Sequence, residues 1–244
     1  MLTKIDCHEW QGTIYPTKLS ELLGTIQKAI VEKRSDNPSS LWCIPLSRDS
    51  GEFEHCFSLL TDAEKSRADR FRHEGARTQF VIGHGVIHLL LNEYLGNNYA
   101  HISWKESEHH KPFVQLPDGS RPLEFNLSHC EDYIAIALGS TSQGVDIENI
   151  RSLKDLEGIS RQVFTEKEIS ILFASNDRDT QNSTFFKFWT CKEAVLKANG
   201  TGFMKDRKKI EIDLNPTESS NEHRVYWYGS LEKHSVAWTE NLSL

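Results

Sequence analysis

Cysteine pairs, long apolar runs and an excess of positive charge are all missing from this sequence of 244 residues. The five cysteines are an odd number, and no two of them form a C-x-x-C pair. This spacing argues against a structural zinc site or a disulfide framework, and it predicts a reducing, cytoplasmic environment. The formal net charge of −7 argues against a general nucleic-acid-binding protein.

Signals for membranes and secretion are also missing from the sequence. No apolar run reaches the roughly 20 residues that a membrane-spanning helix needs. The first residues, Met1 to Asp6, lack the basic and apolar regions of a secretory signal peptide. With 38% hydrophobic and 26% charged residues, the chain has the composition of a globular protein with a sizeable core. We therefore expect neither a membrane nor a nucleic acid as a partner.

Helical and extended patterns alternate along the chain. Apolar spacing predicts helices over 19–31, 58–95, 156–164, 166–174 and 184–198. Strands are predicted over 41–46, 102–105, 113–116, 125–127, 133–138, 144–147, 210–214, 225–228 and 236–238. Glycines at 75 and 83–85 predict a division of the 58–95 stretch into two helices, and the strand over 144–147 is expected to pair with that over 133–138. Helices precede strands twice, which indicates an α+β fold with subdomains at 1–139 and 140–244.

Two carboxylates lie in the segment Gly144–Glu148. Side chains alternate along a strand, so Val145 and Ile147 are expected to point into the core. Asp146 and Glu148 then point together to the other face, where they repel each other unless one is protonated or a cation lies between them. Because Mg²⁺ prefers hard oxygen ligands, the segment is a candidate metal site. A solvated face of an edge strand is the alternative.

A second group of candidate residues lies in Trp189–Ala194 and is followed by Lys197. Glu193 and Lys197 are four residues apart, so they share one face of the predicted helix. Such pairs are also common on exposed helices, which is the alternative here. Aromatic side chains at 185, 186, 188 and 189 predict that much of this helix is buried, and this favours a functional pair.

A third group lies in Phe125–His129, where a serine and a histidine follow a predicted strand. Turn-forming roles are the alternative for both of these residues. Lys111, which precedes Pro112, could offer a fixed cation nearby. Upstream, an otherwise acidic protein has a locally basic segment that could instead be an exposed helix of mixed charge. Its cations are Lys65, Arg67, Arg70, Arg72 and Arg77.

In this order, the motifs resemble those of the surfactin-type (Sfp-type) 4′-phosphopantetheinyl transferases. The matching motifs are R-x-x-R-F at Arg67–Phe71, Lys111–Pro112, Phe125–His129, Gly144–Glu148, and W-x-x-K-E-A at Trp189–Ala194 with Lys197. Together they extend over more than half of the chain. The W-x-x-K-E-A form is similar to that of the W/KEA subgroup, which serves lipid and polyketide carriers.

The resemblance implies an α+β pseudo-dimer of two similar subdomains with the active site in the cleft between them. It implies an Mg²⁺-dependent holo-carrier-protein synthase, which moves the phosphopantetheine arm of coenzyme A to a serine and releases adenosine 3′,5′-bisphosphate. The implied partners are coenzyme A and an acyl, peptidyl or polyketide carrier protein, and the enzyme is expected to be a monomer.

The resemblance also implies roles for individual residues. The matching metal-binding acids are Asp146, Glu148 and Glu193. The implied catalytic residues are Glu193, as the general base, with Lys197 and His129. The implied coenzyme A-binding residues are Arg67, Lys111, Ser128, His129, Asp146, Glu193 and Lys197. The general base would take a proton from the serine hydroxyl, a step that is typically worth about 10²- to 10⁴-fold in rate.

Two further hypotheses remain open. A magnesium-dependent nuclease or phosphohydrolase could use the same acids, but it leaves Ser128–His129 and Lys111–Pro112 without a role.

A carrier surface is expected between the two metal motifs, where a solvated helix face over core residues is the alternative. Its cations are Arg151, Lys154, Arg161 and Lys167, and its apolar residues are Leu153, Leu156, Val163 and Phe164.

Overall fold

The computed structural model describes residues 2–9, 14–16, 21–22, 40–46, 50–108, 111–200, 207–216, 224–229, 231 and 233–240. The helix predicted over 19–31 lies largely outside these ranges. The chain forms two compact units, one of residues 1–12, 107–111 and 141–244 and the other of residues 13–106 and 112–140. Both units combine helices with a β-sheet, which confirms the α+β class with two similar subdomains.

The unit with residues 141–244 has a five-stranded sheet with the order β8-β11-β10-β1-β9. The strands are β8 (Gln143–Asn149), β11 (His234–Glu240), β10 (Arg224–Tyr228), β1 (Thr3–Glu9) and β9 (Ile210–Asp213). β1 runs parallel to β9 and β10, and these pairings hold the N-terminal strand in this unit. The sequence instead predicts that this strand belongs to the subdomain of residues 1–139.

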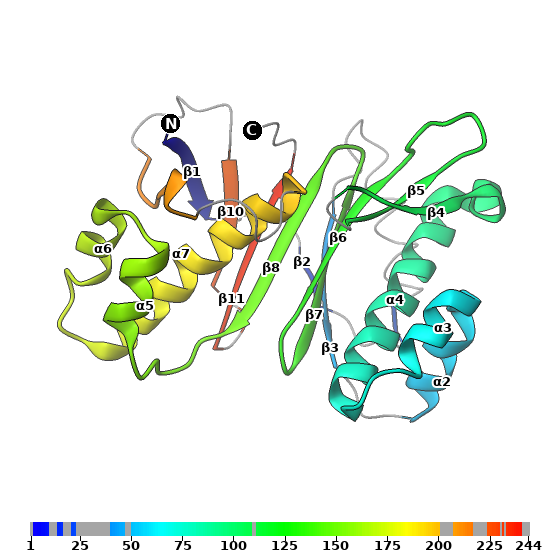
Figure 1. Ribbon diagram of the computed structural model, residues 1–244, viewed down its shortest axis with the longest axis horizontal. Coiled ribbons are helices and arrows are strands. Elements are labelled where there is room, and N and C mark those ends of the chain that lie inside the picture. The colour runs from blue at the N-terminus through cyan, green and yellow to red at the C-terminus, as the bar shows by residue number, and fades with distance from the viewer. Residues whose placement is uncertain are drawn as a thin grey trace. The chain divides into compact units, whose positions relative to one another are not determined.

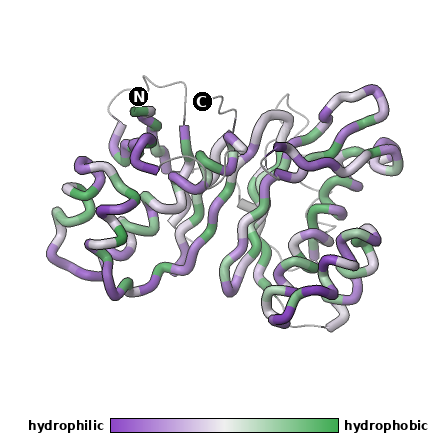
Figure 2. Tube along the Cα trace, in the orientation of Figure 1, coloured by the Kyte–Doolittle hydropathy of each residue, from purple (hydrophilic) through white to green (hydrophobic). Residues whose placement is uncertain are grey.

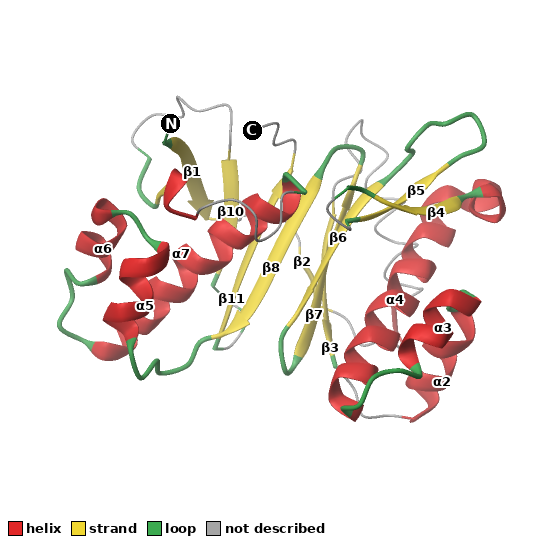
Figure 3. Cartoon of the chain, viewed as in Figure 1, coloured by secondary structure: helices red, strands yellow, loops and turns green. Residues whose placement is uncertain are grey.

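Three helices cover this sheet (Figures 1 and 3). They are α5 (Leu156–Val163), α6 (Glu166–Leu172) and α7 (Arg178–Ala198), and a short 3₁₀ helix, η4 (Arg207–Lys209), precedes β9. α7 is in contact with β8, β11 and β10. Its aromatic residues Phe185, Phe186 and Phe188 are buried, as the sequence predicts, so the helix is anchored to the core along much of its length.

The other unit has a four-stranded sheet with the order β2-β3-β7-β6 and a two-stranded sheet of β4 and β5. The strands are β2 (Ile14–Pro16), β3 (Ser40–Pro45), β7 (Tyr133–Gly139), β6 (Glu124–His129), β4 (Ser103–Glu106) and β5 (Pro112–Gln115). The helices are α2 (Ser50–Leu59), α3 (Asp62–Ala68), α4 (Glu74–Leu95) and η2 (Gly96–His101). Figure 2 shows hydrophobic stretches along α4 and along these strands.

The prediction that the 144–147 strand pairs with the 133–138 strand is wrong. β8 pairs antiparallel with β11, and β7 pairs with β3 and β6. Both edges of β7 are therefore already hydrogen-bonded within its own sheet. Apolar pattern and a short polar turn cannot distinguish a hairpin from two strands that belong to different sheets.

The predicted division of the 58–95 stretch is confirmed next to Gly75, because α3 ends at Ala68 and α4 begins at Glu74. The predicted break at Gly83–Gly85 is wrong, because α4 runs without interruption through both glycines. A Cβ at Gly83 would lie 2.7 Å from Cδ1 of Leu127, and one at Gly85 would lie 2.5 Å from Cβ of Cys56. The glycines thus allow β6 and α2 to approach the helix closely. At the start of α3, Thr61 and Glu64 form a capping box, in which each side chain accepts a hydrogen bond from the backbone N–H of the other residue.

Candidate functional site

A close approach of β8 to α7 fixes the position of the first acidic motif. A Cβ at Gly144 would lie 2.0 Å from the carbonyl oxygen of Ala194 and 2.8 Å from Cβ of Ala198. Only glycine fits at this point, so the motif's first residue brings β8 directly against the helix. The acids that follow on β8 therefore lie on a strand that packs against α7, and Asp146 contacts Lys197 of that helix.

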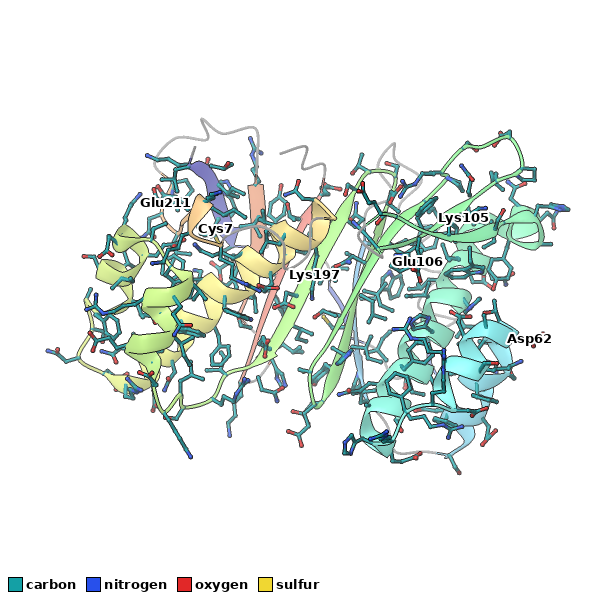
Figure 4. All side chains as sticks on the ribbon, in the orientation of Figure 1. Cys7, Asp62, Lys105, Glu106, Lys197 and Glu211 are labelled. Carbon is teal, nitrogen blue, oxygen red and sulfur yellow. The ribbon has the colours of Figure 1, made fainter. Side chains whose placement is uncertain are left out.

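Asp146 forms an ion pair with Lys197. Lys197 Nζ lies 2.6 Å from Asp146 Oδ1, and the two side chains are 28% and 6% exposed. Lys197 is in the last turn of α7, where this helix is in contact with β8 (Figure 4). The pair therefore joins the two predicted motifs directly, and it holds the Asp146 carboxylate in a nearly dry environment.

Glu193 is paired with a residue that the motifs do not include. Arg207 Nε lies 2.6 Å from Glu193 Oε1, and the side chains are 17% and 10% exposed. The Arg207 guanidinium also lies over the Trp189 ring, with its central carbon 5.1 Å from the ring centroid. The sequence carries no signal for this contact, because Arg207 lies outside every motif and 14 residues after Glu193.

Glu148 is the third predicted acid and has weaker partners. Trp189 Nε1 donates to Glu148 Oε1 at 3.3 Å, and Arg151 NH1 lies 3.4 Å from Glu148 Oε2. Burial raises the pKa of the Glu148 carboxyl, and the nearby Asp146 carboxylate raises it further. The two acids of β8 are therefore close enough to repel each other, as the alternation of the strand predicts.

The three acids come from β8 and α7 of one unit, but each is bound by groups of the protein. Among the described residues, no three histidine, cysteine, aspartate or glutamate side chains form a preformed metal cluster. The cations Lys197, Arg207 and Arg151 neutralise part of the negative charge instead. A hard cation bound here would compete with these side chains for the carboxylates.

Lys111 belongs to the same unit as the acids. Its Nζ donates to the carbonyl oxygen of Gln143 at 2.8 Å and to that of Ala198 at 3.3 Å. The Ala198 carbonyl is at the C-terminal end of α7, where the helix dipole favours a cation. The lysine therefore ties the start of β8 to the end of α7, beside the turn that carries Lys197.

Ser128 and His129 lie in the other unit, as does Arg67. β6 extends through Ser128 and His129, which pair with Ala135 and Ile134 of β7. Both residues therefore belong to the strand, whereas the sequence predicted that they come after it. Ser128 is buried and His129 is exposed. Because side chains alternate along the strand, the histidine faces away from the serine.

Arg67 is an exposed residue of α3 whose guanidinium stacks on Phe80 of α4, with its central carbon 5.1 Å from the ring centroid. Phe80 in turn packs against His84, at 4.1 Å between ring centroids. His84 Nδ1 lies 2.7 Å from Glu64 Oε1, and His88 Nε2 lies 2.9 Å from Glu64 Oε2. The carboxylate of Glu64 therefore fixes α3, and with it Arg67, against α4.

The backbone of Thr61 shows which group accepts the hydrogen bonds at the centre of this network. The Thr61 N–H can only donate, and it donates to Glu64 Oε2 at 2.8 Å, so the carboxylate is the acceptor. His88 Nε2 then donates to Glu64 Oε2 at 2.9 Å, and His88 Nδ1 lies 2.5 Å from the Tyr99 hydroxyl oxygen. Burial alone would raise the pKa of the Glu64 carboxyl. The hydrogen bonds that it accepts outweigh burial and hold its pKa well below the usual range.

Replacing Glu64 by glutamine is expected to lower the free energy of unfolding by about 1.5–3 kcal/mol at neutral pH. A carboxyl with a depressed folded pKa stabilises the fold above its unfolded pKa of about 4.5. That contribution is lost as the pH falls through the folded value. Urea unfolding at about pH 7.5, 5 and 3.5 measures the difference in free energy of unfolding between the wild type and the variant. The difference should be full at the two higher pH values and smaller at the lowest. A difference that is independent of pH would contradict the account.

A buried ion pair that the sequence analysis missed holds the middle of α7. Lys192 Nζ lies 2.7 Å from Glu168 Oε2, and the two side chains are 1% and 0% exposed. Lys192 also donates to the carbonyl oxygens of Ile210, at 2.6 Å, and Arg207, at 2.9 Å. A lysine on an aromatic, buried helix needs an acid, and Glu168 in the capping box of α6 was the available signal.

Comparisons with known proteins agree with this arrangement of motifs. The 4′-phosphopantetheinyl transferase superfamily matches residues 142–240, and the N-terminal region of 4′-phosphopantetheinyl transferases matches residues 47–141. The chain is 35% identical over 179 residues to the 4′-phosphopantetheinyl transferase HetI of Nostoc sp., covering 73% of this chain and 75% of that protein. It is 30% identical to the transferase gsp of Aneurinibacillus migulanus, over 68% of both chains.

The chain is also 28% identical to the transferase Sfp of Bacillus subtilis, over 70% of this chain and 73% of that protein. The matched regions contain both acidic motifs and the Ser128–His129 motif. Among the helices of the described residues, none is long and apolar enough to span a bilayer. The chain therefore belongs to the 4′-phosphopantetheinyl transferase superfamily, whose enzymes transfer the phosphopantetheinyl group of coenzyme A to carrier proteins.

Proposed function

We propose that phosphopantetheinyl transfer by this enzyme depends on Mg²⁺ held by Asp146, Glu148 and Glu193. The donor chemistry fits, because all three ligands are carboxylates and Mg²⁺ is bound through carboxylates together with substrate phosphates. The observation that carries the proposal is the direct packing of β8 on α7 at Gly144, because the acids of the two motifs lie on these two elements. The repulsion between Asp146 and Glu148 also favours a bound cation.

Bound Mg²⁺ would neutralise negative charge on the diphosphate of coenzyme A. Glu193 would accept the proton of the carrier's serine hydroxyl, whose oxygen then attacks the β-phosphorus while the bond to adenosine 3′,5′-bisphosphate breaks. Lys197 would place positive charge beside the leaving group. Lys111, Ser128, His129 and Arg67 would bind the nucleotide and its phosphates.

The experiment that tests this proposal measures release of adenosine 3′,5′-bisphosphate with and without an apo-carrier protein, at increasing Mg²⁺. Transfer predicts release that needs both the carrier and the metal, and that equals the carrier modified. Release without a carrier would favour the phosphohydrolase hypothesis, which the family membership does not support. Release that is unchanged after exhaustive chelation would contradict the metal assignment.

We further propose that an acidic carrier docks on the exposed cations of α5 and the loop before it. Lys154 and Arg161 are exposed, whereas Leu156 and Phe164 are buried in the core. The contact would therefore be mainly electrostatic, which suits two proteins of negative net charge. Arg151 is unsuitable for a test, because it is a partner of Glu148.

Reversal of Lys154 and Arg161 to glutamate is expected to raise the KM for an acidic carrier several-fold and to leave the KM for coenzyme A nearly unchanged. Added salt should weaken carrier use by the wild type more than by the variant, because salt screens an attraction that the variant lacks. Equal salt sensitivity of the two proteins would place the docking surface elsewhere. Glu166→Gln on the neighbouring α6 is a control at an exposed position.

The W/KEA subgroup and a cytoplasmic location remain our proposals. The W-x-x-K-E-A motif supports the subgroup, and its Trp189, Lys192 and Glu193 each contact a specific residue outside α7. Five buried cysteines that are all free thiols suit a reducing compartment. Comparison of transfer to lipid, polyketide and peptide carriers would test the subgroup.

A further inference from the structure

One face of α7 holds Arg207 at three points. Residues three and four apart share a helix face, so Trp189, Lys192 and Glu193 are neighbours there. Lys192 Nζ donates to the Arg207 carbonyl oxygen at 2.9 Å, which anchors the backbone. The guanidinium stacks over Trp189, and its Nε bonds Glu193 at 2.6 Å. Backbone, side-chain plane and charge of Arg207 are thus each fixed by a residue of the W-x-x-K-E motif.

The backbone anchor is itself rigid. Lys192 is 1% exposed and is held by the Glu168 carboxylate at 2.7 Å. It also donates to the Ile210 carbonyl at 2.6 Å, just beyond η4. The position of Arg207 therefore depends on buried contacts rather than on the conformation of a surface side chain.

The charge balance explains why such a contact is needed. Glu193 is 10% exposed, and a carboxylate with so little access to water is costly unless it has a charged or hydrogen-bonding partner. A charge-assisted bond from a guanidinium satisfies it in the absence of metal. The same carboxylate is the one that the proposed function assigns to Mg²⁺.

We propose that Arg207 is an internal counter-ion that binds Glu193 in the metal-free enzyme and is displaced from it by the divalent cation. This inference rests on the proposed function, because it takes Glu193 as a metal ligand. Two cations compete for one carboxylate, so the guanidinium stabilises the metal-free protein and at the same time weakens metal binding. Metal affinity is then set partly by a residue that does not bind the metal.

Direct metal binding tests this exchange without reference to activity. Mn²⁺ titration of the purified enzyme, followed by calorimetry and by the electron paramagnetic resonance signal of free Mn²⁺, would compare wild type with Arg207→Gln and Arg207→Met. Methionine keeps an apolar stem that can pack on Trp189, so Arg207→Met still gives a measurement if the glutamine variant folds poorly. Arg161→Gln, at an exposed ion pair with Glu157, is the matched control.

Both Arg207 variants are expected to bind Mn²⁺ about tenfold more tightly than wild type, as loss of one competing charge-assisted bond implies. Their metal-free forms should melt at a lower temperature, and saturating Mg²⁺ should raise that temperature more than it does in wild type. Affinity that is unchanged or weaker in both variants would overturn the inference.

Glu193→Gln separates failure of this inference from failure of the proposed function. If Glu193→Gln loses the Mn²⁺ site while the Arg207 variants bind as wild type does, only the counter-ion is wrong. If Glu193→Gln binds Mn²⁺ as wild type does, the metal assignment is wrong and the counter-ion falls with it.

Discussion

Replacing Glu193 by glutamine is expected to lower the rate of phosphopantetheinyl transfer by about 10²- to 10⁴-fold, the usual contribution of a general base. Glutamine keeps the size of the side chain and can still accept a hydrogen bond from Arg207, but it neither accepts a proton nor offers a carboxylate to Mg²⁺. The fold should survive, because only the charge of one ion pair is removed. Steady-state transfer at saturating Mg²⁺ and coenzyme A measures the effect.

Two controls define this result. Glu166→Gln removes an exposed carboxylate from α6 and should leave transfer unchanged. Far-UV circular dichroism and the melting temperature should show that Glu193→Gln is folded, with a modest loss of stability because Arg207 loses its charged partner. Transfer by folded Glu193→Gln within a few-fold of wild type would refute the assignment of Glu193 as a general base.

Replacing Lys192 by methionine is expected to lower the free energy of unfolding by about 3–5 kcal/mol, the typical cost of leaving one charge of a buried pair without its partner. The Glu168 carboxylate would lose Lys192 and keep the backbone N–H groups of Thr165 and Ile212, each at 2.8 Å. The carbonyl oxygens of Ile210 and Arg207 would lose a donor. Urea unfolding would measure the loss.

The same substitution at an exposed lysine is the matched control. Lys167 is itself exposed and pairs with Asp213 at the surface and, at 3.7 Å, with the buried Glu211, and its replacement by methionine should cost about 0–1 kcal/mol. The double variant Lys192→Met with Glu168→Gln should be less destabilised than the sum of the two single variants, because both charges are gone. A cost below 1 kcal/mol for Lys192→Met alone would mean that the pair does not hold α7.

Much of the local structure could be predicted because it depends on short-range rules. The capping box of Thr61 and Glu64 and the glycine stop of α7 at Gly200, whose φ is 66°, follow from neighbouring residues. The partner of β8 could not be predicted, because pairing with β11 joins segments far apart in sequence. The continuity of α4 was missed since a glycine in a helix can serve a close contact, which only the structure reveals.

The candidate site divides in the same way. The alternation of β8 and the Glu193–Lys197 spacing predicted which residues share a face of each element, but not that Asp146 pairs with Lys197 at 2.6 Å. The pairing of Glu193 with Arg207 joins residues from separate elements that no motif connects. Sequence patterns can therefore select the acids, but they cannot identify the cations that bind them.

Intact-mass spectrometry of an apo-carrier protein incubated with this enzyme and coenzyme A tests the central claim most directly. With Mg²⁺ present, we predict that the carrier gains the mass of one phosphopantetheinyl group on a single serine, and that its serine-to-alanine variant gains nothing. The enzyme's Glu193→Gln variant should leave the carrier almost unmodified over the same time. An unmodified carrier with folded wild-type enzyme, or modification that persists in Glu193→Gln, would contradict the account.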